Sequence, residues 1–500
     1  MNCSPQTNRL SGSGDARFGG LFETLGFLTL ITAGTFVFLA SWLSSNQAAA
    51  FTVLILISLI GLSWWRFDGG RHPCFFFLCT LTLFQGGRLL AYLSGSVQEI
   101  FRVTLLTVYS FDVSRNVQGL VLLSIALSAL CIYAPCRWSY RRATPPLSAQ
   151  FDLYLPYFYC LFTLSVPVQL YKNFCYYQYA KQHGGYLVFF LDHGGMAASI
   201  PLAVRAISVI SLPAIVGILV LERRKKWLRT ATAIYFLVAA PILLTGSRGA
   251  IFSLILALWY LAKMKSNGHA RWYAVALIGI TLIVLASLIG SLRTDSSESF
   301  AVAGTSRFLQ EQGTSLDVTS VAIAYRQHFA PHIAAYLIGE MELAFVAPDQ
   351  TKYKLGQHFA DDVSMFLNPS AYQLGFGTGS SYLAEAYVMG GLPGVALVSG
   401  LLGTLLHCMH LYSRSPLGLF LVTLLLPDVL WMARGGLLDW VSVAARITFS
   451  LLLLWIGWWL YLVCIRLGSV LWQAPTQFCL LDTDVRRSSW AGRDLSPRKL

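Results

Sequence analysis

The chain has 500 residues, of which 56% are hydrophobic and only 12% are charged, with a formal net charge of +13. Soluble proteins carry about 25% charged residues, so the composition excludes a set of several soluble domains and indicates that lipid is the main solvent. The basic residues form short clusters between apolar segments, which argues against the single basic face of a nucleic-acid-binding module.

Membrane-spanning helices are predicted along most of the chain. Residues 1–20 are polar and lack a cleavable signal, so we expect the first apolar segment to remain in the mature protein. A bilayer core about 30 Å thick requires roughly 20 apolar residues per helix. The twelve candidate spans are residues 21–42, 51–65, 74–93, 118–134, 152–171, 201–221, 230–246, 250–262, 273–291, 380–410, 417–432 and 446–464. The tenth contains Gly390, Gly391 and Pro393 and is expected to be broken there.

The distribution of lysine and arginine predicts the orientation of these spans. With both termini cytoplasmic, the inner segments carry 22 basic residues and the short outer loops carry 7. This asymmetry is the one expected for a multi-pass protein with an inside N-terminus.

The same topology defines five segments. They are a cytoplasmic N-terminus (1–20), nine transmembrane helices (21–291), a large periplasmic loop or cap (292–379), three transmembrane helices (380–464) and a basic cytoplasmic tail (465–500). The loop carries five basic and nine acidic residues, with apolar residues at helical spacing. We therefore expect it to be partly folded, and long loops of this kind often carry function.

Arginines at the ends of the spans are candidate ligands for phosphate. Arg248 lies in a tight Gly-Ser turn, Arg293 ends the ninth span, and Arg434 and Arg446 flank the last outer loop. The planar guanidinium donates paired hydrogen bonds and stays charged, which suits a diphosphate. The alternative is that each arginine reaches lipid head groups or pairs with a nearby carboxylate.

A glycine-rich turn precedes the tenth span. Gly377 and Gly379 permit close backbone approach, and Ser380 and Ser381 begin a helix whose free N–H groups can meet an anion. Glu385 follows about one turn into an apolar helix. A carboxylate there either pairs with an arginine or works as a base.

The histidines and cysteines give weaker signals. His358 is a candidate proton carrier, whereas Pro331 interrupts the helix that a metal pair of His328 and His332 would need. The ten cysteines include no CxxC pair and most lie in apolar segments, so neither a disulfide framework nor a zinc site is expected. The sequence predicts no metal and no cofactor.

Two segments carry a resemblance to a known family. Residues 244–254 contain the Ser-Arg-Gly turn, and residues 357–394 contain His-Phe-Ala-Asp-Asp, Asn-Pro-Ser, the glycine-rich turn and Gly-Gly-Leu-Pro-Gly. With the large outer loop before the last spans, the chain resembles the Wzy-type O-antigen polysaccharide polymerases (oligosaccharide repeat-unit polymerases) of bacterial inner membranes.

The resemblance implies an all-α, polytopic, GT-C-like membrane glycosyltransferase of about twelve spans. It would transfer a glycan from undecaprenyl diphosphate to the non-reducing end of a new lipid-linked repeat unit, without metal or nucleotide. We assign catalysis to Glu385, His358 and Arg248. We assign substrate binding to eight residues, which again include the first of these arginines: Arg248, Arg293, Arg326, Arg434, Gly377, Gly379, Ser380 and Ser381. The implied partners are the lipid-linked oligosaccharide, membrane lipid, a chain-length regulator and a flippase.

Three other functions stay open. One is an O-antigen ligase with a lipid A acceptor, although Ser380 and Ser381 stand where ligases often carry a His-Asn type motif. Another is a lipid-linked oligosaccharide flippase or other transporter, which would carry charges deep in many spans. The third is a structural or sensor protein that docks through its basic tail.

Overall fold

The computed structural model describes nine stretches of the chain, which are residues 45–95, 99–105, 109–138, 154–183, 199–244, 249–265, 308–342, 355–373 and 377–463. They are mostly helical, which confirms the expected helical membrane fold. A small antiparallel hairpin of β1 and β2, in which Arg102 pairs with Asp112, is the one departure from an all-α fold within these stretches.

The helices and strands of these stretches are named in chain order. They are α2 (Ser45–Arg66), α3 (Pro73–Leu93), β1 (Arg102–Leu105), β2 (Tyr109–Asp112), α4 (Arg115–Trp138), α5 (Leu155–Gln182), α8 (Leu202–Val209), α9 (Ser211–Leu221), α10 (Lys225–Leu244), α11 (Gly249–Lys265), α14 (Thr314–Ala324), α15 (Arg326–Phe329), the 3-10 helix η2 (Ala330–His332), α16 (Ile333–Glu342), α17 (Phe359–Leu367), α18 (Pro369–Gln373), α19 (Tyr382–Tyr412) and α20 (Pro416–Trp431). A further helix spans Asp439–Val463.

Ten of the twelve predicted spans fall on described helices, and the spans at 21–42 and 273–291 lie outside the described residues. Within the described part of the chain, six helices are long and apolar enough to cross a bilayer: Asn46–Arg66, Pro73–Leu93, Arg115–Arg137, Leu202–Leu221, Tyr382–Tyr412 and Asp439–Val463. The chain is therefore a polytopic membrane protein, while the count of twelve stays a prediction.

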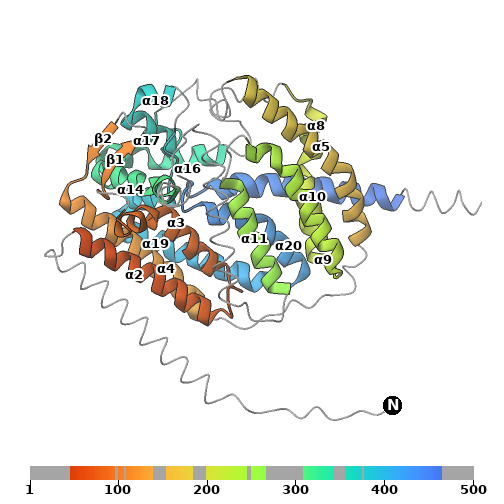
Figure 1. Cartoon of the computed structure of the whole chain (residues 1–500), viewed down its shortest axis with the longest axis horizontal. Coiled ribbons are helices and arrows are strands. Elements are labelled where there is room, and N and C mark those ends of the chain that lie inside the picture. Colours follow the sequence, from red (N-terminus) through yellow and green to blue (C-terminus); the bar gives the residue numbers. More distant parts are fainter. Residues whose placement is uncertain are drawn as a thin grey trace, which may run out of the picture.

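The helices form two packed groups (Figure 1). One contains α2, α3, α4, α14 and α19, and the other contains α5, α8, α9, α10, α11 and α20. Contacts of α20 with α3 and α19 join the two groups. The candidate site described below belongs to the first group.

The pairing of α4 with α19 depends on small residues. A Cβ at Gly403 would overlap the carbonyl oxygen of Ile132, so only glycine permits this approach. The hydroxyls of Ser128 and Tyr382 lie 2.5 Å apart, and Ser399 donates to Ser128 at 2.9 Å. These buried hydroxyl bonds fix the register of the two helices.

The helix α19 is broken where the sequence predicts a break. Gly390 and Gly391 have non-helical backbone angles, and Gly391 has a φ of 62°. That value lies in the left-handed region that glycine adopts without strain. The break separates a short first half, residues 382–389, from the long second half.

Much of the predicted outer loop packs among the spans. The helix α14 contacts α3, α4 and α19 and is buried along almost its whole length. Close approach is possible because a Cβ at Gly313 would lie 2.6 Å from the Arg88 backbone nitrogen, and one at Gly87 would lie 2.8 Å from the Leu309 carbonyl oxygen. The periplasmic placement of this segment stays a prediction.

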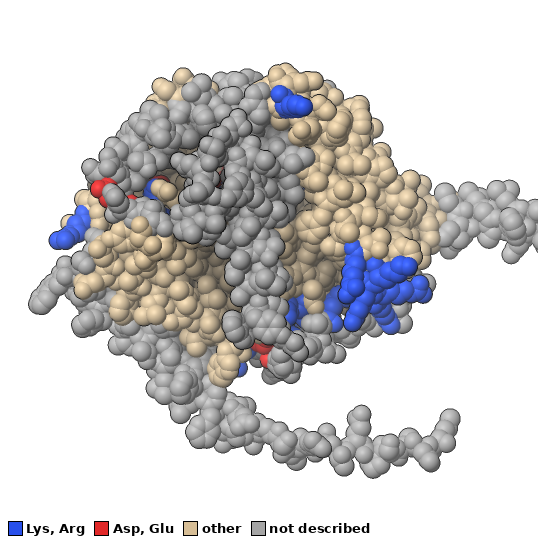
Figure 2. Space-filling view, viewed as in Figure 1, with Lys and Arg blue, Asp and Glu red and all other residues tan. Residues whose placement is uncertain are grey.

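Exposed basic side chains gather where α9 meets α10, and a large blue cluster marks them in Figure 2. They are Arg223, Arg224, Lys225, Lys226 and Arg229. This segment is one of those predicted to be cytoplasmic, and the exposure of its basic side chains agrees with a role at the polar surface of the membrane.

Candidate active site

The first turn of α19 holds the carboxylate that the sequence singles out. Glu385 is fully buried, with an exposed fraction of 0%. The Ser380 hydroxyl donates a hydrogen bond to its Oε1, and the Leu437 N–H donates to its Oε2 at 2.8 Å. Gly379, with a φ of 74°, turns the chain so that Ser380 reaches back to Glu385.

A second buried carboxyl group meets Glu385 from another element. Glu340, in the last turn of α16, is 4% exposed, and its Oε2 accepts the Leu438 N–H at 2.7 Å. Its side chain is hydrogen-bonded to that of Glu385. Two carboxyl groups can bond in this way only if they share a proton.

Burial, and next the carboxylates of Glu385 and Asp439, raise the pKa of Glu340 far above its usual range. The shared proton therefore stays on the pair at neutral pH, with Glu340 as its main holder. Glu340 was not among the predicted site residues. Its position in the short apolar helix Ile333–Glu342 is the one sequence signal that could have identified it.

The segment between α20 and the last helix closes over this pair. The Gly436 N–H donates to Oδ2 of Asp439 at 2.7 Å, which holds a tight turn. A Cβ at Gly436 would overlap Oε1 of Glu340, so the glycine allows the backbone to cover the carboxyl pair. Asp439 thus adds a third acidic side chain beside Glu340 and Glu385.

His358 lies at the same place in the fold. It is the N-terminal cap residue of α17, and the backbone of its neighbour Gln357 touches Gly339, next to Glu340. The ring is close enough to Asp439 for the two to interact electrostatically. Within the described part of the chain, its buried Nδ1 has no hydrogen-bond partner, so this nitrogen is available to a ligand.

The two aspartates after His358, Asp361 and Asp362, have different surroundings. Asp362 is 1% exposed, and its Oδ2 accepts the Tyr336 hydroxyl at 2.6 Å and the Gly356 N–H at 2.8 Å. It therefore anchors the loop before α17. Burial raises the pKa of Asp361, whereas the nearby His358 lowers it.

Arg434 lies in the segment that contacts the carboxyl pair, three residues before Leu437, whose N–H donates to Glu385. A Cβ at Gly379 would lie 3.5 Å from the Arg434 carbonyl oxygen. The guanidinium donates to Gln312 Oε1 at 2.8 Å and lies 5.8 Å from the ring centre of Phe84 and 5.7 Å from that of Trp431. These rings hold the guanidinium in place by cation–π contacts.

The other predicted arginines are placed differently. Arg326 is exposed and donates from Nε to the Val388 carbonyl oxygen at 3.2 Å, three residues beyond Glu385 on α19. Arg446 is also exposed and contacts Ser442 on its own helix. Arg248 and Arg293 lie outside the described residues, so their convergence with Arg434 stays a prediction.

The glycine-rich turn is held mainly by contacts within the chain. The Tyr382 N–H donates to the Met432 carbonyl oxygen at 3.2 Å, and the Leu383 N–H donates to Ser381 Oγ at 3.3 Å. The Thr378 N–H donates to Ser364 Oγ at 2.9 Å. Three backbone donors that the sequence offered to an anion are therefore already satisfied, and anion binding by Gly377, Gly379, Ser380 and Ser381 stays a prediction.

A buried network of hydrogen bonds from α3 and α14 holds the start of α19. Gln85 on α3 donates to Ser381 Oγ at 2.8 Å and to the Ala433 carbonyl oxygen at 3.4 Å, and its Oε1 accepts the Thr319 hydroxyl at 3.2 Å. One side chain thus joins α3, α14, the cap of α19 and the segment that carries Arg434.

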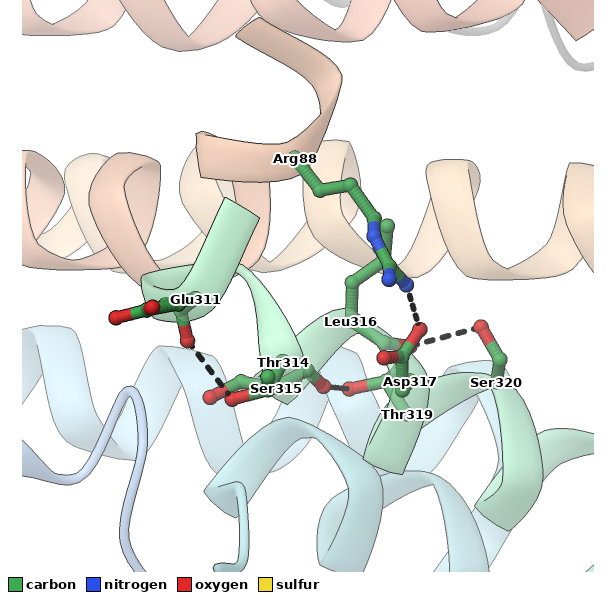
Figure 3. Close-up of polar contacts among 8 residues, drawn as sticks. All are labelled: Arg88, Glu311, Thr314, Ser315, Leu316, Asp317, Thr319 and Ser320. Atoms are coloured by element: carbon green, nitrogen blue, oxygen red, sulfur yellow. Dashed lines mark hydrogen bonds and ion pairs between the residues drawn. The ribbon is translucent and has the colours of Figure 1, made fainter. Parts of the chain in front are cut away.

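An ion pair one turn further along α3 completes this support. The guanidinium of Arg88 bonds the carboxylate of Asp317 on α14 (Figure 3), and both side chains are 3% exposed. Burial raises the pKa of Asp317 to about 7, although Arg88 opposes the shift. The high cost of removing these charges from water makes each partner depend on the other.

The comparison with known proteins identifies the family. Residues 24–464 match the sequence model of the family described as O-antigen polysaccharide polymerase Wzy. The chain belongs to this family. It is therefore a multi-pass membrane protein of the Wzy polymerases, which polymerise O-antigen repeat units carried on lipid. No curated protein and no solved structure matches the chain.

The Wzy site predicts a strong effect of one added methyl group. A Cβ at Gly339 would overlap the Gln357 carbonyl oxygen and lie 3.2 Å from His358 Nδ1. Gly339→Ala should therefore push α16 away from His358 and destabilise the protein by about 1–3 kcal/mol. The unfolding temperature in detergent and the rate of polymer formation should both fall.

The matched control is Gly119→Ala. Gly119 lies within α4, and a Cβ at this position would meet open space, so alanine there should be neutral or slightly stabilising. Equal unfolding temperatures for the two variants would contradict the close packing of α16 on the segment before α17.

Proposed function

We propose that this chain joins undecaprenyl-diphosphate-linked repeat units by glycosyl transfer at the periplasmic face of the bacterial inner membrane, with both termini cytoplasmic. The observation that carries the proposal is the pair of buried carboxyl groups, Glu385 and Glu340, at the first turn of α19. Buried, proton-sharing carboxyl groups are typical of sites for acid–base chemistry.

The reaction balances with Glu385 as the base. A hydroxyl at the non-reducing end of the acceptor attacks C1 of the donor's reducing-end sugar. The bond between C1 and the phosphate oxygen breaks, and undecaprenyl diphosphate leaves. Glu385 accepts the hydroxyl proton in place of the hydrogen bond that it now accepts from Ser380.

Arginines stabilise the departing diphosphate in this proposal. Arg434, with Arg248 and Arg293, binds the phosphates, because charge develops there as the glycosidic bond breaks. Arg326 and His358 contact the glycan, and the nearness of His358 to the acidic cluster also suits a second proton carrier. A flippase would deliver the substrate and a chain-length regulator would act on the product.

The arginine assignment predicts a loss of rate in Arg434→Ala. Removal of one donor to a developing oxyanion costs about 10²–10³-fold in rate, and Arg434→Lys should recover only part, since an ammonium group donates without the paired fork. Single-turnover rates with lipid-linked repeat units measure the effect. Full activity of the alanine variant would remove Arg434 from the diphosphate site.

One experiment tests the reaction itself. Purified protein is incubated with lipid-linked repeat units, without added nucleotide or divalent metal, and the products are separated by size. A polymerase gives a ladder of lengthened glycans on the lipid. A ligase needs lipid A to form product, and a flippase leaves the units single, so either result would contradict the proposal.

The shared proton predicts a pH dependence. The pKa of folded Glu340 lies far above the value of about 4.3 in an unfolded chain. Folding therefore retains a proton that the unfolded state releases, and this stabilisation declines as pH rises between those two values. The slope for one such proton is at most about 1.4 kcal/mol per pH unit.

Glu340→Gln should remove that slope, because the amide cannot ionise. We expect its unfolding temperature to exceed that of the wild type by a larger margin at pH 9 than at pH 6. Parallel curves for the two proteins across this range would show that Glu340 does not hold the proton.

A further inference from the structure

Three metal-binding side chains meet at the end of the bundle opposite Glu385. His72 caps the N-terminus of α3, Cys74 lies in its first turn, and Cys136 lies near the end of α4. One ligand atom of each lies within 4.8 Å of the others, and all three residues are fully buried. Distance in the sequence hides this cluster, which is why the spacing of the cysteines predicts no metal site.

The donor set selects a particular class of metal. Thiolate sulfur and imidazole nitrogen are preferred by Zn²⁺ and Cu(I), whereas Mg²⁺ and Ca²⁺ prefer oxygen. Zn–S bonds of about 2.3 Å and Zn–N bonds of about 2.0 Å place tetrahedral ligand atoms roughly 3.3–3.8 Å apart. A small contraction of the cluster is therefore enough to surround an ion.

We propose that His72, Cys74 and Cys136 bind one thiophilic closed-shell metal ion, either Zn²⁺ or Cu(I). The two thiols each lose a proton to solvent on binding, and the imidazole binds in its neutral form.

Existing hydrogen bonds would be exchanged for metal bonds. The Cys74 N–H now donates to His72 Nδ1 at 3.1 Å, and Cys136 Sγ donates to the Gly403 carbonyl oxygen at 3.2 Å. Binding through Nδ1 displaces the first of these, and binding through Nε2 moves the ring proton to Nδ1. In both cases the helix-cap bond is lost, and the bond from Cys136 to Gly403 is lost with the thiol proton, while three metal–ligand bonds form.

The two ions differ in their need for a fourth donor. Structural Zn²⁺ is almost always four-coordinate, whereas Cu(I) is satisfied by three soft ligands. His410, in the last turns of α19, stacks on His72 with ring centroids 4.6 Å apart, and His407 stacks at 5.8 Å. A rotation of the His410 ring would bring the fourth ligand for Zn²⁺ and would tie α19 to α3 and α4.

The site has a structural role in this proposal. Glu385 lies in the first turn of α19 and His410 in its last turn, on the two sides of the break at Gly390 and Gly391, so the metal takes no part in glycosyl transfer. It would join α3, α4 and α19, and two of these helices also support the candidate site, since Gln85 lies on α3 and Glu385 in the first turn of α19. The inference is independent of the proposed function.

The test measures metal content in the full-length protein, purified in detergent without chelator and then loaded separately with Zn²⁺, Cu(I) or Co²⁺. We expect about one ion per chain and, with Co²⁺, a sulfur-to-metal charge-transfer band. Cys74→Ser and Cys136→Ser should lose both. The matched controls are Cys79→Ser on α3 and Cys131→Ser on α4, which lie outside the cluster and should keep both.

His410→Ala separates the two ions, since it should weaken Zn²⁺ binding and leave Cu(I) binding unchanged. Wild-type protein that takes up none of the three ions would overturn the proposal, and so would an ion that persists in Cys74→Ser or Cys136→Ser. Mass spectrometry of freshly purified protein that reveals a Cys74–Cys136 disulfide would overturn it as well. Should the serine variants fail to fold, the wild-type Co²⁺ titration still decides, because its absorption band requires thiolate ligands.

Discussion

Glu385→Gln should lower polymer formation by about 10²–10⁴-fold, the usual contribution of a general base. The amide keeps the size of the side chain, and its oxygen can still accept the Leu437 N–H that now bonds Oε2. It cannot accept the proton of the attacking sugar hydroxyl. The rate of repeat-unit consumption, normalised to folded protein, measures the loss.

The control for this substitution is Glu99→Gln. Glu99 is an exposed carboxylate before the hairpin, so its change tests for general effects of a lost acidic group. Equal activity of Glu385→Gln and the control would show that Glu385 is not the base, and His358 would then be the next residue to replace. Polymerisation that continues in the variant would leave the reaction class intact while removing this residue from it.

The second large effect concerns the buried ion pair. Asp317→Asn leaves the Arg88 guanidinium buried without a counter-charge, and such a change costs about 3–5 kcal/mol. Arg88→Met should cost less at neutral pH, because a stranded carboxyl group can take up a proton whereas a guanidinium cannot lose one. Thermal unfolding of each variant in detergent measures the difference.

The order of these two effects depends on pH. Without Arg88, the pKa of Asp317 should lie above its present value of about 7, so folding retains the proton and the Arg88→Met protein should weaken further as pH rises. Arg88→Met combined with Asp317→Leu should recover most of the stability, since no buried charge remains.

Arg115→Ala is the control for the ion pair, because Arg115 is exposed at the first residue of α4. It should change stability by less than about 0.5 kcal/mol. A double variant no more stable than Asp317→Asn would contradict the account of desolvation as the dominant cost.

The sequence predicts the helices well where hydropathy alone decides. Apolar length located ten spans on described helices, and Gly390 and Gly391 located the break in α19. The burial of α14 was missed, because its composition resembles both an amphipathic cap and an inserted helix. Its insertion depends on the facing glycines Gly87 and Gly313, a pairing between distant segments that periodicity cannot reveal.

The candidate site, too, could be predicted from the sequence only in part. Glu385 could be singled out because a carboxylate in an apolar helix is costly, and the structure gives it a buried partner. Glu340 could not be paired with it, since the contact joins α16 to α19 through the turn at Gly436. The cysteines show the same limit, because Cys74 and Cys136 meet only after α3 and α4 have packed.

The Arg88–Asp317 pair also bears on how the chain is made. The two residues are 229 positions apart, so a ribosome releases the arginine into the membrane long before its counter-ion has been synthesised. A lone arginine at the centre of a span costs about 2.5–3.5 kcal/mol during insertion by the translocon, and Arg88, five residues before the end of α3, costs less than this. The hydrophobicity of the other residues of Pro73–Leu93 must offset that cost until α14 has been synthesised. The first group of helices, which contains α3 and α14, can therefore complete its packing only late in biogenesis.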